Sequence, residues 1–192
     1  MRAEIDFIVW LQSFSSPVLD VVAKITSYFF NYPMAVLVAL LFFFLYDKKY
    51  GIFFGIVTAV SAGIQFCLKL LFNRPRPYLA SVEVQNIYQA LGSSFPSGHS
   101  VTAMGIALFV GLVVFKSHLS KTKKGLIYGG LAVYLLLNLL NRTYLGQHYL
   151  TDIFAGFALM VIIFVVSLWI YPYFCKACNK LIKKSKRENQ NG

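Results

Sequence analysis

The sequence predicts an all-α protein, an integral membrane helical bundle with five spanning helices and an N-terminal interfacial helix. The first observation is composition, because 58% of the 192 residues are hydrophobic and only 13% are charged, which is too apolar for a soluble domain. The second is that the apolar residues form long runs, several of them near the ~20 residues that a spanning helix needs. We expect one membrane-embedded domain over residues 1–175 and a basic tail over residues 176–192.

Residues 5–14 are apolar but too short to cross a bilayer, and acidic residues precede them. Such a segment is typical of a helix that lies in the plane of the membrane interface. The side chains expected on its membrane face are Phe7, Ile8, Trp10, Leu11 and Phe14. If this segment merges with the run that follows, the bundle has six spans instead of five, and that alternative stays open.

The five expected spans are residues 17–46, 51–72, 96–115, 125–140 and 149–171. The first is too long for one straight helix and contains Asn31, Tyr32 and Pro33, so we expect a tilted or kinked span. The fourth is short, but Asn138 and Asn141 indicate that it ends against other helices rather than in lipid.

The formal net charge of +11 could indicate a nucleic-acid partner, but the placement of the basic residues argues against one. Twelve of the eighteen Lys and Arg residues lie in residues 47–50, 116–124 and 176–187. These segments share one side if five spans alternate, and the positive-inside rule makes that side cytoplasmic. We therefore expect a plasma-membrane protein whose partners are the lipid bilayer and a membrane lipid, with its site on the extracytoplasmic side. Its oligomeric state is left open.

Three polar clusters end apolar runs on that extracytoplasmic side. Residues 69–77 read K-L-L-F-N-R-P-R-P, residues 95–100 read F-P-S-G-H-S, and residues 142–152 read R-T-Y-L-G-Q-H-Y-L-T-D. Together they supply cations, two histidines and one carboxylate. This set of groups suits nucleophilic chemistry on a phosphate monoester or diphosphate at a membrane surface.

In the third cluster, His148 and Asp152 are four residues apart at a predicted helix start, so they share one face. The carboxylate can fix the imidazole tautomer, leave the other nitrogen free to attack, and stabilise the imidazolium that forms. A polar pair that merely caps the helix is the alternative, and it explains the histidine poorly. We expect Gln147 to lie in an exposed loop.

In the second cluster, Ser93 or Ser94 is expected to cap the following helix. The backbone N–H groups around Ser97 and Gly98 would then form an anion site at the helix N-terminus. His99 is placed to protonate a leaving oxygen as general acid.

In the first cluster, Lys69 lies one turn from the end of a span, where its cation could face the site or extend to the interface. Arg76 stands between two prolines on a stiff extended turn, which suits a bidentate grip on phosphate oxygens. Arg74 could act in the same way, and only the family resemblance described next favours Arg76.

The three clusters resemble the motifs of the type-2 phosphatidic acid phosphatase superfamily of membrane lipid phosphatases. That family's pattern is K-x6-R-P, then P-S-G-H, then S-R-x5-H-x3-D. The matching positions are Lys69, Arg76 and Pro77, then Pro96, Ser97, Gly98 and His99, then Arg142, His148 and Asp152. One position departs from the pattern, because Asn141 stands where the family has serine. Asn141 is therefore a possible phosphate contact.

The resemblance implies metal-independent hydrolysis of a phosphate monoester or diphosphate on a membrane lipid, through a phosphohistidine and without a cofactor. It implies that His148 is the nucleophile, Asp152 its orienting partner and His99 the acid. The phosphate cradle that it implies is Lys69, Arg76, Ser97, Gly98 and Arg142. Undecaprenyl pyrophosphate, phosphatidylglycerol phosphate, phosphatidate and lipid A phosphates all fit as substrates. The alternatives are a vanadate-dependent haloperoxidase-like enzyme and a non-catalytic anionic-lipid binder or transporter.

Overall fold

The computed structural model describes residues 2–188 and is all-helical in its regular structure, as predicted. The end of the predicted basic tail, residues 189–192, lies outside the described residues. The helices are α1 (Arg2–Gln12), α2 (Pro17–Ser27), the 3-10 turn η1 (Tyr28–Phe30), α3 (Tyr32–Leu45), α4 (Lys48–Phe72), α5 (Pro77–Ala80), α6 (Gly98–Lys116), α7 (Lys121–Tyr144) and α8 (Leu150–Glu188).

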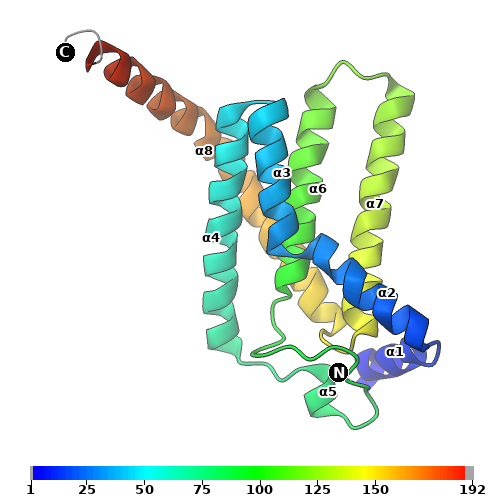
Figure 1. The fold of residues 1–192 in the computed structure, drawn as a ribbon. Helices are drawn as coiled ribbons and strands as arrows, with labels where there is room; N and C mark the ends of the chain where they lie inside the picture. The colour runs from blue at the N-terminus through cyan, green and yellow to red at the C-terminus, as the bar shows by residue number, and fades with distance from the viewer. Residues whose placement is uncertain (1, 189–192) are drawn as a thin grey trace.

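Four helices, α4, α6, α7 and α8, are long and apolar enough to cross a membrane. The first predicted span is divided among α2, η1 and the shorter apolar helix α3, and α2 slants away from α3 (Figure 1). A fifth crossing is counted if the bent pair Arg2–Gln12 and Pro17–Phe30 is taken as one span. The predicted kink lies at Asn31, whose side chain accepts a hydrogen bond from the Tyr32 N–H and caps α3. This arrangement agrees with the predicted five-span bundle.

Helix α7 is longer than the predicted fourth span. It begins after Ser120, whose hydroxyl caps it by accepting from the Lys123 N–H, and it continues to Tyr144. Asn138 and Asn141 are both buried in its last turns, so the helix does end against protein, as predicted.

Helix α1 crosses the end of the bundle, and the segments Arg2–Gln12 and Pro17–Phe30 meet at an angle of 117° (Figure 1). This bend means that α1 and α2 do not form one straight additional span. Trp10 and Phe14 are exposed on α1 and in the turn after it, as expected of a membrane face. The assignment of Ile8 to that face was wrong, because Ile8 is fully buried in a cluster with Ile5 and Tyr149.

The core lies between α3, α4, α6 and α8 and is rich in aromatic side chains. Phe109 is at its centre, with ring centroids 4.8 Å from Phe54 and 5.2 Å from Phe164. The Tyr50 hydroxyl donates to the Phe109 carbonyl at 2.8 Å, which satisfies this buried polar group between two spans. The core therefore fixes how the four helices align along the bundle.

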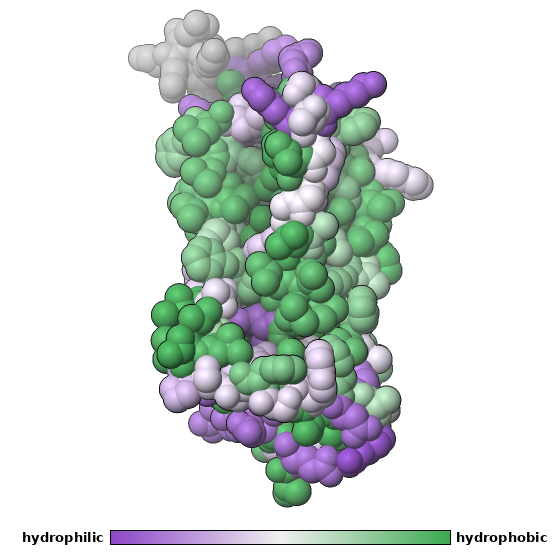
Figure 2. Space-filling view, turned by 90° about the vertical axis from the view of Figure 1, so that its right-hand side faces the viewer, coloured by the Kyte–Doolittle hydropathy of each residue, from purple (hydrophilic) through white to green (hydrophobic). Residues whose placement is uncertain are grey.

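The two ends of the bundle carry different chemistry. The three polar clusters lie together at the end beside α1 and α5, whereas the loops α3–α4 and α6–α7 and the end of α8 lie at the opposite end (Figure 1). An apolar band separates two polar ends on the molecular surface (Figure 2). The predicted grouping of the basic segments on one side is therefore present in the fold.

We predict that Gly51→Ala destabilises the bundle, because α3 packs directly on this glycine of α4. A Cβ at Gly51 would lie 2.7 Å from the Ala39 carbonyl oxygen and 2.7 Å from the Phe43 Cα. Backbone atoms cannot rotate away, so the free energy of unfolding should fall by about 1–3 kcal/mol. Thermal unfolding in detergent measures this change.

The matched control is Gly63→Ala, on the same helix, where a Cβ would meet nothing within 4 Å. Its melting temperature should equal or exceed that of the wild type, because alanine is the better helix former. Equal melting temperatures for Gly51→Ala and the wild type would show that α3 does not approach α4 so closely.

Candidate active site

The site forms where four helix ends meet. The end of α4 brings Lys69, the start of α6 brings His99, the end of α7 brings Arg142 and the start of α8 brings Asp152. These elements converge at the lower end of the bundle (Figure 1). Residues 83 positions apart along the sequence, Lys69 and Asp152, thereby contribute to one site.

Lys69 and Arg76 are held by backbone carbonyls of the loop before α6. Arg76 donates from Nε to the Gly92 carbonyl at 3.0 Å and from Nη2 to the Leu91 carbonyl at 2.9 Å. The Lys69 ammonium donates to the Ser93 carbonyl. Carbonyl partners fix both side chains while leaving their positive charges uncancelled, which suits an anion site.

Arg142 is fully buried and is held by two side-chain amides. Its Nε and Nη2 donate to Asn141 Oδ1 at 3.1 and 2.7 Å, and its Nη1 donates to Gln147 Oε1 at 2.9 Å. The expectation that Gln147 lies in an exposed loop was wrong, because this residue is only 1% exposed. Its place beside His148 in the motif was a signal that could have indicated a role in the site.

The start of α6 differs from the predicted start. Ser97 is itself the N-cap and accepts from the Ser100 N–H, so α6 begins at Gly98. The prediction of Ser93 or Ser94 as the cap was wrong, because the Ser93 hydroxyl accepts from the Arg74 N–H at 3.0 Å instead. The N–H groups of Gly98 and of the residue after it lie in the first turn, where a helix supplies no acceptor.

His148 follows a tight turn after α7, in which Gly146 has a φ of +71°. A side chain there would be strained and would clash, since a Cβ would lie 2.5 Å from the Gln85 carbonyl oxygen. The turn directs His148 into the site, where it is 3% exposed. Its Nδ1 lies 3.7 Å from Oδ2 of the fully buried Asp152, within ion-pair range but beyond a hydrogen bond.

Burial lowers the pKa of His148 to about 4, and the neighbouring positive charges of Arg76 and Lys69 act in the same direction, while the Asp152 carboxylate opposes them. The imidazole is therefore neutral at neutral pH. A neutral imidazole keeps a lone pair for attack on an electrophile.

Sequence reasoning missed a second ion-pair network around Asp152. Arg74 Nη1 lies 2.6 Å from Asp152 Oδ1 and Nη2 lies 3.5 Å from Glu4 Oε2. Glu4 Oε1 accepts from the backbone N–H of Thr151 at 2.9 Å. Glu4 and Thr151 are 147 residues apart, so no local pattern could have indicated this contact.

A family model, described as the PAP2 superfamily, matches residues 50–176, which contain all three clusters. The chain belongs to the PAP2 superfamily. Undecaprenyl-diphosphatase BcrC of Bacillus subtilis (strain 168) is 27% identical over 190 residues, covering 92% of this chain and 93% of that protein. Phosphatidylglycerophosphatase B of the same organism is 30% identical over 137 residues, covering 70% of this chain and 64% of that protein.

Two solved structures share the fold of this chain. The crystal structure of Aquifex aeolicus LpxE superposes with a TM-score of 0.70 at 25% identity, covering 85% of this chain and 93% of that one. The first transmembrane PAP2-type phosphatidylglycerolphosphate phosphatase from Bacillus subtilis gives a TM-score of 0.75 at 21% identity, covering 88% and 84%. The chain is thus an integral membrane protein and a lipid phosphatase of the PAP2 family.

We predict that Arg74→Gln destabilises this PAP2 phosphatase, because the variant leaves the Asp152 carboxylate buried without its closest cation. The remaining contact to Asp152 Oδ2 from the Tyr149 N–H is 3.0 Å long. Loss of the charged partner should lower the free energy of unfolding by about 1–3 kcal/mol. The control is Arg2→Gln, whose ion pairs with Asp6 and Glu83 are solvent-exposed. The melting temperature of this control should equal that of the wild type. Equal melting temperatures for Arg74→Gln and Arg2→Gln would contradict the prediction.

Proposed function

We propose that this chain hydrolyses a phosphate monoester or diphosphate of a membrane lipid through a phosphohistidine on His148. One observation carries the proposal: a buried, neutral imidazole lies among positive charges, with a fully buried carboxylate on its other side. A structural histidine does not need such surroundings. A nucleophile that attacks a phosphoryl group does need them, because both the phosphate and the imidazolium that forms must be stabilised.

The phosphate is proposed to bind to Lys69, Arg76 and Arg142, with the Ser97 hydroxyl and the N–H of Gly98 as further donors. Arg76 and Arg142 are fixed by three hydrogen bonds or more each, so little reorganisation is needed when the anion enters. No metal ion or cofactor is part of the proposed reaction.

In the first step His148 Nε2 attacks phosphorus, since Nδ1 faces Asp152. The bond from phosphorus to the leaving oxygen breaks, and His99 gives that oxygen a proton. In the second step water attacks phosphorus, and His99 takes up one of its protons. Inorganic phosphate leaves, and His148 returns to the neutral form. Asp152 is proposed to shorten its 3.7 Å contact while His148 carries positive charge.

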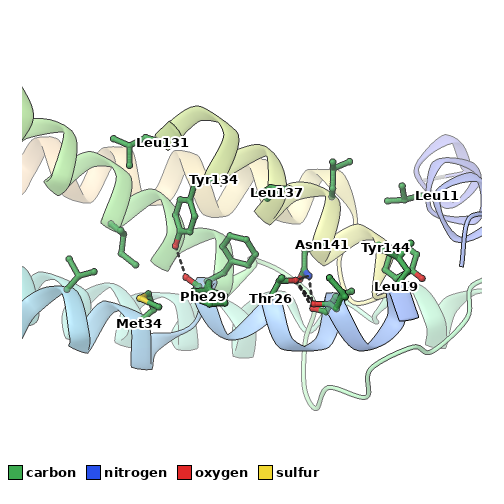
Figure 3. Close-up of a pocket in the computed structure, with 16 residues that line it drawn as sticks. Leu11, Leu19, Thr26, Phe29, Met34, Leu131, Tyr134, Leu137, Asn141 and Tyr144 are labelled. Atoms are coloured by element: carbon green, nitrogen blue, oxygen red, sulfur yellow. Dashed lines mark hydrogen bonds between the residues drawn. The ribbon is translucent and has the colours of Figure 1, made fainter. Parts of the chain in front are cut away.

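A large apolar cavity beside the cradle supports a lipid as the substrate. It measures about 670 Å³ and lies between α2, α3, α6 and α7, with Leu19, Phe29, Met34 and Leu137 among the side chains that line it (Figure 3). One end of this cavity reaches Asn141, directly before Arg142. We infer that the hydrocarbon part of the substrate is accommodated on this apolar side of the cradle.

Within the lipid phosphates we propose a polyprenyl diphosphate or a phospholipid phosphate as substrate. The undecaprenyl-diphosphatase relative supports this choice, because its similarity extends over nearly the whole of both chains. A phosphatidylglycerophosphatase and the lipid A 4'-phosphatase of Porphyromonas gingivalis, 27% identical over 148 residues, are also similar. A non-catalytic lipid binder is the competing function, but it has no use for the His148–Asp152 pair.

We further propose that the site faces the extracytoplasmic side of the plasma membrane and that the basic end of α8 is cytoplasmic. The grouping of the basic segments at the end opposite the site supports this orientation (Figure 1). Residues 1–175 are proposed to form the phosphatase domain and residues 176–192 its cytoplasmic tail. Helix α8 runs through this boundary to Glu188 without a break, so the tail continues the last span.

We predict that His148→Ala lowers phosphate release by at least about 10³-fold, because no other nucleophile replaces the imidazole. The assay uses purified protein in detergent with undecaprenyl diphosphate, phosphatidylglycerol phosphate, phosphatidate and a lipid A phosphate. The control is His118→Ala, a histidine in the loop between α6 and α7, far from the site. Phosphate release by His148→Ala near the wild-type rate would disprove the mechanism, and no release from any lipid by the wild type would favour the binder.

We predict that residue 83 is accessible from outside the cell and residue 122 is not. Cys67, Cys175 and Cys178 are first replaced by serine, and Glu83→Cys or Thr122→Cys then adds one reporter thiol. Glu83 precedes α6 at the site end, whereas Thr122 lies in the first turn of α7 at the basic end. A membrane-impermeant thiol reagent should label intact cells only through the first reporter. Labelling in the opposite order would reverse the proposed orientation.

A further inference from the structure

We infer that Asn141 is a positioning residue that fixes the orientation of the Arg142 guanidinium and ties it to α2. This inference rests on the proposed function, because it assigns to Arg142 a bound phosphate. It concerns the one position at which this chain departs from the motif pattern, where asparagine stands in place of serine. The inference excludes a direct contact between Asn141 and the phosphate.

The Asn141 amide has no hydrogen-bonding capacity left for a substrate. Its Nδ2 donates to the Ala23 carbonyl at 2.7 Å and to the Thr26 hydroxyl at 3.0 Å. Its Oδ1 accepts from both Nε and Nη2 of Arg142. An asparagine amide has two N–H donors and two acceptor sites, so all four are used. The reverse orientation of the amide would place N–H groups against Arg142, which has only donors, and is therefore ruled out.

Arg142, by contrast, has a defined pair of N–H groups left over. A guanidinium has five N–H donors, and the amides of Asn141 and Gln147 take one each from Nε, Nη1 and Nη2. One N–H on Nη1 and one on Nη2 have no acceptor in the part of the chain whose side chains are described, residues 2–183. In the proposed function these two groups donate to oxygens of the phosphate. Asn141 thus determines which pair of donors faces the anion.

The clamp on Arg142 is neutral, and it is anchored on both sides. Asn141 is tied to α2 through Ala23 and Thr26, and Gln147 donates from Nε2 to the Tyr88 carbonyl at 2.8 Å. In the described part of the chain no carboxylate lies within ion-pair distance of Arg142. Amides hold the guanidinium without cancelling its charge, so that charge remains for the phosphate.

The same hydrogen bonds connect the cradle to the apolar cavity. Ala23, Thr26 and Asn141 all line that cavity, and hydrogen bonds from Asn141 join α7 to α2 along its wall (Figure 3). A serine at position 141 has one hydroxyl and a shorter side chain, so it could not make all four bonds at once. In this chain α2 therefore supports the phosphate-binding arginine through Asn141.

The test is a double-mutant cycle with Asn141→Ala and Arg142→Lys, measured on kcat/KM for phosphate release from lipid. Misplacing the guanidinium should lower kcat/KM of Asn141→Ala by about 10- to 100-fold. Asn141→Ser, which restores one hydroxyl, should recover part of this loss. In the Arg142→Lys background, adding Asn141→Ala should change kcat/KM by less than about 3-fold, because the two residues act as one unit. The control Leu136→Ala, on the same helix but exposed and not among the residues that line the cavity, should retain the wild-type rate.

A second readout does not need turnover or a lipid. Orthovanadate resembles the transferred phosphoryl group, so it should raise the melting temperature of the wild type. The concentration needed for half of this shift should rise for Asn141→Ala by the same factor by which kcat/KM falls, and it should not rise for Leu136→Ala. A protein that has merely lost stability would melt lower but keep the wild-type vanadate affinity, and that outcome would overturn the inference.

Independent, multiplicative losses in the two variants would also overturn the inference, because they would show that Asn141 acts by a route other than Arg142. That failure is distinguishable from failure of the proposed function. If His148→Ala is inactive while the decreases in kcat/KM of Asn141→Ala and Arg142→Lys multiply, the phosphohistidine mechanism is supported and the proposed role of Asn141 is wrong. If the wild type releases no phosphate, the proposed function is wrong. The same double-mutant cycle, measured on the vanadate concentration needed for half of the melting-temperature shift, still decides whether Asn141 acts through Arg142.

Discussion

Three cations that lack a carboxylate partner, the buried Arg76 and Arg142 and the half-buried Lys69, are the constraint on which the rest of the site depends. Lys69, Arg76 and Arg142 have carbonyl and amide partners, and across residues 2–183 none of them has an acidic side chain within ion-pair distance. Removing charged groups from water costs several kcal/mol each unless an opposite charge compensates. In the proposed function a bound phosphate offsets that cost, so the substrate rather than the protein supplies the opposite charge.

The carboxylates near the site pair with Arg74 and not with the three cations of the cradle. Asp152 is paired with Arg74, and Glu4 reaches Arg74 from α1, which the buried Gln12 fastens to the Gln85 and Tyr144 carbonyls. A free carboxylate beside Arg142 would compete with the phosphate. The N-terminal helix thus has two functions in this structure: it exposes aromatic side chains toward the interface, and it holds the acidic side of the ion-pair network away from the cradle.

The sequence could predict the features that depend on local spacing. The motif positions Lys69 and Arg142 do converge, because each lies at the end of an apolar run and runs alternate in direction across a membrane. Features that depend on contacts distant in sequence could not be predicted. Glu4 reaches Thr151 over 147 residues, and Ile8 is buried in a cluster that contains Val84 and Tyr149, which are distant from it in the sequence. Gln147 was misjudged for a different reason, since a polar side chain in a loop is buried when a buried arginine needs an acceptor.

The loop before α6 combines two kinds of polar group. Its backbone carbonyls face inward: those of residues 91–93 hold Arg76 and Lys69, the Ala90 carbonyl accepts from the Tyr78 hydroxyl, and the Tyr88 carbonyl accepts from Gln147. Its exposed side chains include the apolar Val82 and Leu91 and the polar Glu83, Gln85, Asn86 and Gln89. In the proposed function the carbonyls therefore position the cations that bind the phosphate, and the exposed side chains are the groups of this loop that a headgroup can contact. The hydrocarbon part would be selected on the other side of the cradle, where α2 and α7 border the apolar cavity.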